Sequence, residues 1–186
     1  MRLIILAGSP ACGKTLVTTH LIKHIQSNQY RPAVCKIDCI TSEDEGTYAK
    51  LGIPVAQGLS GNICPDHYLA TNVIPIFNWG LRRQADVLLL ETAGLCNRCA
   101  PFTQSALNLC IVDAMGSIKG PAKLGPILTT ADALIVTKVD LITQAEREVL
   151  CTHLQQLNPT AKLFEVNGIS GFGSSDRKSV VLGKSV

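Results

Sequence analysis

The chain opens with the apolar run Arg2-Leu3-Ile4-Ile5-Leu6-Ala7, and Gly8-Ser9-Pro10-Ala11-Cys12-Gly13-Lys14-Thr15 follows it directly. The second stretch matches the phosphate-loop pattern G-x-x-x-x-G-K-[ST] in full. A helical pattern over about residues 16–26 comes next, so the motif lies between a predicted strand and a predicted helix, as the pattern requires. A glycine-rich turn that matches by chance is the alternative, and the elements on either side argue against it.

The residue types of this stretch suit a nucleoside triphosphate. Gly8 and Gly13 can take positive φ and let the backbone approach phosphate oxygens, so that successive N–H groups surround an anion. Lys14 can neutralise the β- and γ-phosphates, Thr15 can place its hydroxyl on Mg²⁺, and the following helix presents its positive end. The predicted nucleotide-binding residues are Gly8, Ser9, Pro10, Ala11, Cys12, Gly13, Lys14 and Thr15, and the last two are also predicted to act in catalysis.

Length and composition predict one α/β domain. The chain has 186 residues, of which 46% are apolar, 17% charged and only 4% aromatic. This composition suits a parallel sheet that is buried on both faces, and it argues against a disordered chain. No apolar run is long enough to span a bilayer, and the first strand starts too early for a signal peptide. We therefore expect a cytoplasmic protein with no membrane partner, whose eight cysteines are reduced thiols.

The formal net charge of +3 is concentrated at the carboxyl end of the chain. Residues 176–186 hold three basic residues and one acid, and they show no helical or strand period that joins the rest. We predict a nucleotide-binding domain over residues 1–175 that lacks its final helix, and a tail of non-native character over residues 176–186. Without this tail the chain is close to neutral, which argues against a nucleic-acid partner.

Apolar runs of strand length alternate with helical patterns along the chain. After the first strand, strands are predicted over residues 33–37, 53–55, 85–90, 106–112, 132–136 and 162–166, and helices over residues 16–26, 41–50, 64–80 and 143–157. Residues 58–63 are predicted to form a loop, and Thr143 to cap the last helix. This alternation predicts a doubly wound, mostly parallel α/β sheet in three layers, with functional residues at the carboxyl ends of the strands.

Four acids end predicted strands and are expected at one edge of the sheet, namely Asp38, Glu91, Asp113 and Asp140. Asp38 and Glu91 follow the two strands that we expect to flank the phosphate loop, where carboxylates hold Mg²⁺ or position the attacking water. We favour Asp38 and Thr15 next to Mg²⁺, with Glu91 as a supporting partner, and we predict catalytic roles for both acids. Either acid could instead cap the loop after its strand, and Asp113 is a weaker candidate.

The tetrapeptide Thr137-Lys138-Val139-Asp140 predicts which base is bound. A carboxylate at a strand end can accept hydrogen bonds from the N1–H and N2–H₂ groups of guanine, whereas adenine presents no such pair of donors. A Thr-Lys pair before an ordinary helix-start acid is the alternative. Together with the phosphate loop, the motif favours GTP, bound through Thr137, Lys138 and Asp140.

Two short motifs supply soft or borderline metal ligands. Cys64 and His67 lie three residues apart at a predicted helix start, and Cys96 and Cys99 form a C-x-x-C motif in a predicted loop. Thiolate and imidazole groups at these spacings suit Zn²⁺ or Ni²⁺. Reduced surface thiols and a solvated histidine are the alternative, and cysteines within the predicted strands are expected to be core residues.

The stretch from Met1 to about Gly173 resembles the CobW/HypB/UreG family of P-loop GTPases, especially the nickel-insertion GTPases of hydrogenase and urease maturation. Residues 110–141 are the most specific match, because they are similar to the urease accessory GTPases from the Val-Ile-Asp strand to the Asn-Lys-x-Asp motif. Cys64-Pro65-Asp66-His67 resembles the Cys-Pro-His of that family with one residue inserted, and Glu91-Thr92-Ala93-Gly94 resembles its Glu-Ser-Gly-Gly.

This resemblance implies a slow GTPase that gates metal delivery. In the family, GTP drives dimerisation, and cysteine and histidine ligands hold a metal ion between protomers until hydrolysis releases it. For this chain the resemblance implies a nucleotide-dependent homodimer and a Ni²⁺ or Zn²⁺ cargo held by Cys64, His67, Cys96 and Cys99. It also implies a client metalloenzyme or another accessory protein as partner.

Two other functions stay open. An iron–sulfur cluster on Cys96 and Cys99, shared across a dimer, would make the chain a thiol-based maturation factor with the nucleotide as an assembly switch. A small-molecule or nucleoside kinase on the same scaffold would need an arginine-rich lid, and the arginines of this chain are scattered.

Overall fold

The structure is a computed structural model that describes residues 1–40, 45–94, 98–117 and 119–167. The predicted helix-start signal at residues 41–44, Cys96 and the predicted tail at residues 176–186 lie outside these ranges. The division into residues 1–175 and a tail therefore stays a prediction.

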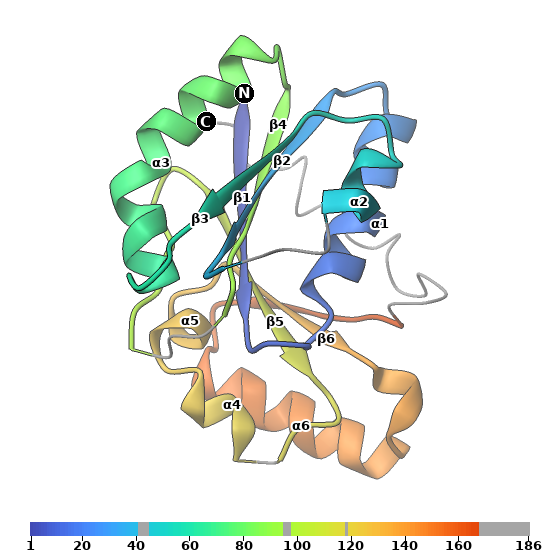
Figure 1. The fold of residues 1–186 in the computed structure, drawn as a ribbon. Helices are drawn as coiled ribbons and strands as arrows, with labels where there is room; N and C mark the ends of the chain where they lie inside the picture. The colour runs from blue at the N-terminus through green and yellow to red at the C-terminus, as the bar shows by residue number, and fades with distance from the viewer. Residues whose placement is uncertain (41–44, 95–97, 118, 168–186) are drawn as a thin grey trace.

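In the described part of the chain, seven parallel strands form one sheet in the order β3-β2-β4-β1-β5-β6-β7 (Figure 1). This arrangement confirms the predicted doubly wound α/β sheet. The strands are β1 (Arg2–Gly8), β2 (Pro32–Asp38), β3 (Val55–Leu59), β4 (Val87–Glu91), β5 (Leu107–Asp113), β6 (Ala133–Thr137) and β7 (Lys162–Glu165).

Helices cover both faces of the sheet, and α3 lies opposite α1 and α2 (Figure 1). The face with α1 (Lys14–Ser27) and α2 (Glu45–Ala49) is called the α1 face below, and the opposite face is called the α3 face. The α3 face carries α3 (Pro65–Arg82), α4 (Gly120–Lys123), α5 (Pro126–Thr129) and α6 (Gln144–Leu157), and a 3₁₀ turn, η1 (Val139–Leu141), follows β6. Of the helices in the described ranges, none has the length and apolar character needed to cross a membrane.

The alternating side chains of β1 explain the three layers. Ile4 and Leu6 pack beneath α1 whereas Ile5 packs beneath α3, and none of the three is more than 2% exposed. Because β1 pairs with β4 on one side and β5 on the other, the turn that follows it lies at the middle of the carboxyl edge of the sheet. This is the switch-point position where open α/β sheets bind ligands.

Two expectations about the strands are wrong. Gly58 and Leu59 belong to β3 rather than to a loop, and Gly58 packs so closely that a Cβ there would lie 2.6 Å from Ile37 Cδ1. The neighbours of β1 are β4 and β5, so β2, which ends at Asp38, lies one strand further from the phosphate loop than expected. The order of strands in the chain does not determine their order in a sheet joined by crossovers.

The predicted cap of α6 is confirmed. Thr143 precedes the helix, its side chain accepts a hydrogen bond from the Glu146 N–H, and the Glu146 carboxylate accepts the Thr143 N–H at 2.8 Å. This reciprocal capping box satisfies two backbone donors that the first turn would otherwise leave without partners.

Candidate nucleotide and metal site

The phosphate loop forms the turn between β1 and α1. Lys14 begins α1, is only 7% exposed, and donates from Nζ to the carbonyl oxygens of Gly8 at 3.0 Å and Ser9 at 2.8 Å. The first turn of α1 holds no acid, and no side chain caps it. A buried ammonium group and the uncapped positive end of a helix therefore meet at this turn, which suits a phosphate group.

The segment that follows β4 packs directly against the start of this loop. Gly94 has φ +78°, and a Cβ on it would lie 1.8 Å from the carbonyl oxygen of Gly8 and 3.0 Å from Lys14 Nζ. Gly8 is equally confined, because its own Cβ would lie 2.3 Å from the carbonyl oxygen of Ile111. Only glycine allows such close approach, so the Glu-Thr-Ala-Gly segment is in direct contact with the loop.

Glu91 is the centre of a buried polar cluster on the α1 face. Its side chain is 1% exposed and accepts hydrogen bonds from Thr15 Oγ1 at 2.9 Å and Thr18 Oγ1 at 3.2 Å. The Tyr48 hydroxyl of α2 also donates to this carboxylate, and Lys36 Nζ lies 3.4 Å from it. Burial raises the pKa of Tyr48, and the negative charge of Glu91 adds to the shift, so the phenol stays a donor.

The Glu91 cluster fits a Mg²⁺ ion at Thr15. Donation of the Thr15 proton to Glu91 turns the oxygen lone pairs of the hydroxyl away from the carboxylate, which is the orientation that ligation of a hard cation needs. Asp38 joins the same cluster through Lys36, whose Nζ lies 3.7 Å from its carboxylate. The structure thus brings together Thr15, Glu91 and Asp38 even though β2 is not adjacent to β1.

The predicted guanine motif is tied to the phosphate loop by two side chains. Thr137 Oγ1 donates to the carbonyl oxygen of Cys12 at 2.7 Å. Lys138, which has φ +58°, donates to the carbonyl oxygen of Ala11 at 3.0 Å and forms an ion pair with Asp113. Asp113 therefore anchors the motif, and the predicted base-binding and phosphate-binding segments form one unit.

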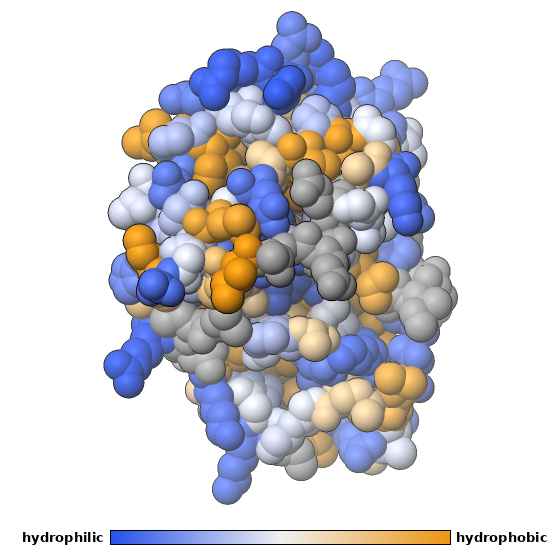
Figure 2. Space-filling view, viewed as in Figure 1, coloured by the Kyte–Doolittle hydropathy of each residue, from blue (hydrophilic) through white to orange (hydrophobic). Residues whose placement is uncertain are grey.

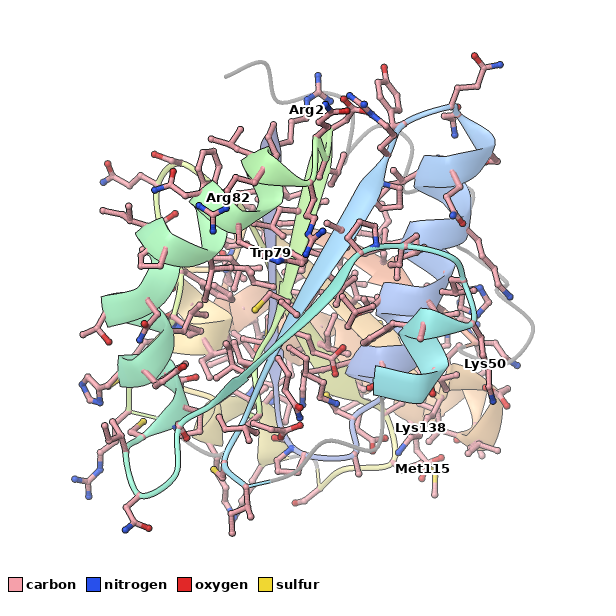
Figure 3. All side chains as sticks on the ribbon, turned by 45° about the horizontal axis from the view of Figure 1, so that its top comes forward. Arg2, Lys50, Trp79, Arg82, Met115 and Lys138 are labelled. Atoms are coloured by element: carbon pink, nitrogen blue, oxygen red, sulfur yellow. The ribbon has the colours of Figure 1, made fainter. Side chains whose placement is uncertain are left out.

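A cavity of about 200 Å³ lies beside this unit. The exposed side chains of Leu16 and Leu141 are two of its walls, and they suit the faces of a flat base. Figure 3 shows Lys138 and Met115 close together at the end of the molecule opposite Arg2, which marks the amino end of β1. The cavity is lined by Gly13, Leu16, Thr137, Lys138, Asp140, Leu141 and Asn167.

The structure brings together two of the four predicted transition-metal ligands. His67 is exposed in the first turn of α3, and its Nε2 lies 3.8 Å from Cys99 Sγ. Cys64 is the N-terminal cap residue of the same helix and is partly exposed. Within the described ranges no group of three His, Cys, Asp or Glu side chains is placed to hold a metal ion, and Cys96 lies outside those ranges.

Exposed apolar side chains surround the start of α3. Ile40 follows β2, Leu59 ends β3, and Ile63 lies in the connection to α3; they are 75%, 48% and 59% exposed. Figure 2 shows apolar surface at the left centre of this face, over the region where Figure 1 draws the end of β3 and the start of α3. These three residues are called the α3-start patch below.

Asp66 also belongs to this part of the molecule, although the sequence analysis treated it only as an inserted residue. It is 3% exposed, and burial raises its pKa to about 6, while the charges of His67 and Lys14 act in the opposite direction. Asp66 therefore lies within the electrostatic reach of both the metal-ligand pair and the phosphate loop.

Sequence reasoning missed several other residues of the site. The sequence could have indicated Lys36, because a lysine inside a strand that is buried on both faces requires an anionic partner. It gave no such signal for Thr18 and Tyr48, since Glu91 is 73 and 43 residues away from them in the chain. Asn167 lies two residues after Glu165, the last residue of β7, and this position near a strand end was a signal for its place in the cavity wall.

The parallel sheet and the loop between β1 and α1 define a P-loop nucleoside triphosphatase fold. A family model described as the CobW/HypB/UreG nucleotide-binding domain matches residues 2–165. The chain therefore belongs to the CobW/HypB/UreG family.

Two relatives are similar in sequence. The uncharacterized protein MJ0120 of Methanocaldococcus jannaschii is 46% identical over 173 residues, which are 93% of this chain and 74% of the relative. Urease accessory protein UreG 1 of Saccharopolyspora erythraea is 28% identical over 148 residues, which are 75% of this chain and 59% of that protein.

Two solved structures have the same fold. The hydrogenase maturation factor HypB from Archaeoglobus fulgidus superposes with a TM-score of 0.80 at 21% identity, over 98% of this chain and 89% of that one. HypB from Helicobacter pylori in complex with nickel gives a TM-score of 0.77 at 20% identity, over 99% of this chain and 86% of that one.

Proposed function

We propose that this chain binds GTP with Mg²⁺, hydrolyses it slowly, and uses the cycle to deliver Ni²⁺ or Zn²⁺ to a metalloenzyme. One observation carries the proposal: Thr137 and Lys138 tie the guanine motif to the phosphate loop, while His67 and Cys99 form an exposed pair at the same edge of the sheet. A triphosphate in the loop would lie close to side chains that suit a soft or borderline metal ion.

The nucleotide roles follow from the contacts. The backbone of residues 8–15 would hold the phosphates, and Lys14 would exchange its carbonyl partners for phosphate oxygens. Thr15 would hold Mg²⁺ directly and Asp38 through water, with Glu91 orienting the Thr15 hydroxyl. When bound, Mg²⁺ neutralises charge on the β- and γ-phosphates.

The cargo role needs a second copy of the chain. Among the described residues one protomer offers Cys64, His67 and Cys99, which is fewer than the four ligands of a tetrahedral site, so two protomers that face each other would complete it. The α3-start patch is exposed beside these ligands and would be covered in such a dimer. HypB from Helicobacter pylori, which shares the fold, has been solved in complex with nickel, which supports this choice of metal.

Base specificity is tested by Asp140→Asn. We expect GTP to bind at least about 100-fold more weakly to this variant, because an amide opposes a donor to the N–H groups of guanine, while xanthosine triphosphate gains affinity. Competition against a fluorescent GDP measures both effects, with Glu148→Gln on the exposed face of α6 as the matched carboxylate-to-amide control. Equal competition by ATP and GTP against the unaltered protein would contradict guanine specificity.

The cargo role is tested by calorimetric titration of Ni²⁺ and of Zn²⁺, with and without a non-hydrolysable GTP analogue and Mg²⁺. We expect one ion per dimer, bound only with the analogue. Cys64→Ala, His67→Ala or Cys99→Ala should each weaken metal binding by more than about 100-fold. Such a loss is larger than the loss of about 10- to 100-fold that follows when a residue that only supports a ligand is removed.

Cys151→Ala is the control for this titration, because burial raises the pKa of the Cys151 thiol to about 11 and leaves little thiolate to bind metal. GTP affinity should stay unchanged in all these variants. Metal stoichiometry that is the same with and without the three ligand residues would rule out the cargo role and leave a GTPase with structural cysteines.

A further inference from the structure

Asp66 differs from the other acids at the carboxyl edge of the sheet. Glu91 binds three hydroxyl groups, Asp38 is paired with Lys36, and Asp113 is paired with Lys138. Asp66 is 3% exposed, yet within the described residues neither of its carboxylate oxygens has a hydrogen-bond partner. Burying a carboxylate without a hydrogen-bond partner costs free energy. Such a group in a native protein is therefore expected to bind a ligand or an ordered water.

Two further buried hydroxyls share the face on which Asp66 lies. Leu90 packs beneath α3, so Thr92, two residues later, lies on the same side of the sheet. Gly58 faces α3 as well, and Ser60 follows it by two residues. Thr92 and Ser60 are at most 5% exposed, and in the described part of the chain their hydroxyls also have no partner.

Figure 1 shows α3, which carries Asp66, on the opposite side of the sheet from α1 and α2, which carry the hydroxyl groups that bind Glu91. Asp66 comes from the first turn of α3, while Ser60 and Thr92 directly follow β3 and β4, which are the strands on either side of β2. The α3 face therefore holds, at the carboxyl edge, three buried polar side chains whose hydrogen-bonding capacity is unused among the described residues. Buried polar groups of this kind suit ordered water.

One of these groups lies two residues from a contact with the phosphate loop. Thr92 precedes Gly94 by two residues, and Gly94 lies against Gly8 and Lys14, the residue that would meet the γ-phosphate. The charge of Lys14 lowers the pKa of Asp66, against the larger effect of burial. A water held by Asp66 and Thr92 would thus lie on the α3 side of the γ-phosphate, while Mg²⁺ at Thr15 would lie on the α1 side.

We propose that Asp66 orients the water molecule that attacks the γ-phosphate, with Thr92 as a second hydrogen-bonding group on that water. The inference rests on the proposed function, because it requires that GTP is hydrolysed. The water oxygen forms a bond to the γ-phosphorus, and the bond from that phosphorus to the bridging oxygen breaks. GDP leaves with the electron pair, and the proton of the water passes to an oxygen of the departing phosphate, while the Asp66 carboxylate accepts a hydrogen bond from the water and orients it.

The test is single-turnover hydrolysis of GTP by metal-stripped protein in excess Mg²⁺. Asp66→Asn should slow the step by about 100-fold or more, because the water loses its orienting acceptor. Affinity for GDP and for a non-hydrolysable GTP analogue should stay within about threefold, while affinity for GDP with aluminium fluoride, which mimics the transferring phosphoryl group, should fall with the rate. Glu148→Gln is the matched carboxylate-to-amide control on α6.

A structural role would give a different pattern. Removal of an acid that merely supports the positive end of α3 would lower the thermal midpoint and leave the hydrolytic step alone. We expect the midpoint of Asp66→Asn to rise instead, because an amide costs less to bury than an unpaired carboxylate.

Two results would overturn the proposal, and a second variant covers the case in which Asp66→Asn does not fold. Hydrolysis within threefold of the unaltered rate overturns the proposal, and so does a rate that higher Mg²⁺ restores, since Asp66 would then act on the cation. If Asp66→Asn fails to fold, Thr92→Val decides: about tenfold slower hydrolysis supports the water site, and an unchanged rate overturns it. Absence of hydrolysis by the unaltered protein would refute the proposed function itself, which is a separate result.

Discussion

Replacement of Glu91 by alanine is expected to lower the free energy of unfolding by about 3–5 kcal/mol, the cost of removing one partner from a buried ion pair. The substitution removes the carboxylate that lies 3.4 Å from the Lys36 ammonium, which is 10% exposed. It also removes the acceptor of the buried Tyr48 and Thr18 hydroxyls. Urea unfolding of the nucleotide-free protein measures the loss, which is a large fraction of the stability of an ordinary domain.

Asp86→Ala is the control for this experiment. The Arg31–Asp86 pair has side chains that are 62% and 36% exposed, so we expect a loss of at most about 1 kcal/mol. Replacement of both Lys36 and Glu91 by apolar residues should recover part of the stability, because the Lys36 ammonium is then no longer buried without the Glu91 carboxylate. A Glu91→Ala variant no less stable than Asp86→Ala would contradict the description of Glu91 as the centre of a buried network.

Gly94→Ala is expected to slow GTP hydrolysis because the added methyl group would clash with the phosphate loop. The added methyl would lie 1.8 Å from the carbonyl oxygen of Gly8 and 3.0 Å from Lys14 Nζ, and the residue would also keep φ +78°. Either the loop or the segment after β4 must move, at a cost of about 1–3 kcal/mol. A displacement of about 1 Å at this position should slow GTP hydrolysis by about 100-fold.

Gly61→Ala separates the clash from the backbone strain. Gly61 has φ +58°, and apart from its chain neighbours no atom of the described residues lies within 4 Å of its hypothetical Cβ, so alanine there meets strain alone, about 1–2 kcal/mol. Unfolding curves and single-turnover rates of the two variants should therefore differ, with hydrolysis lost only in Gly94→Ala. Equal rates in the two variants would show that the contact between Gly94 and Gly8 does not control the loop.

Much of the fold could be predicted because its signals are local. The phosphate loop occupies eight consecutive residues between a strand and a helix, and the Thr143 cap and its Glu146 partner lie within one helical turn. The guanine motif likewise spans only Thr137–Asp140. Such patterns need no knowledge of which strands are neighbours, and the family model that matches residues 2–165 agrees with them.

The strand order and most site contacts could not be predicted in this way. Nothing local to Asp38 says that β2 lies beyond β4, and Gly58 belongs to β3 because of its contacts with Ile37 and with Tyr68 of α3. The predicted nucleotide and metal residues remain predictions, and the structure adds the contacts from which their roles are proposed.

By itself the sequence determined the α/β alternation, the phosphate loop, the guanine motif and the kinds of side chain available for metal binding. Only the tertiary structure decided that Tyr48 and Lys36 converge on Glu91, that Lys138 reaches the loop, and that Asp66 is buried without a partner in the described residues. The physical reason is range. Periodicity and spacing act over a few residues, whereas these contacts join residues far apart in the chain and exist only once both faces of the sheet are packed.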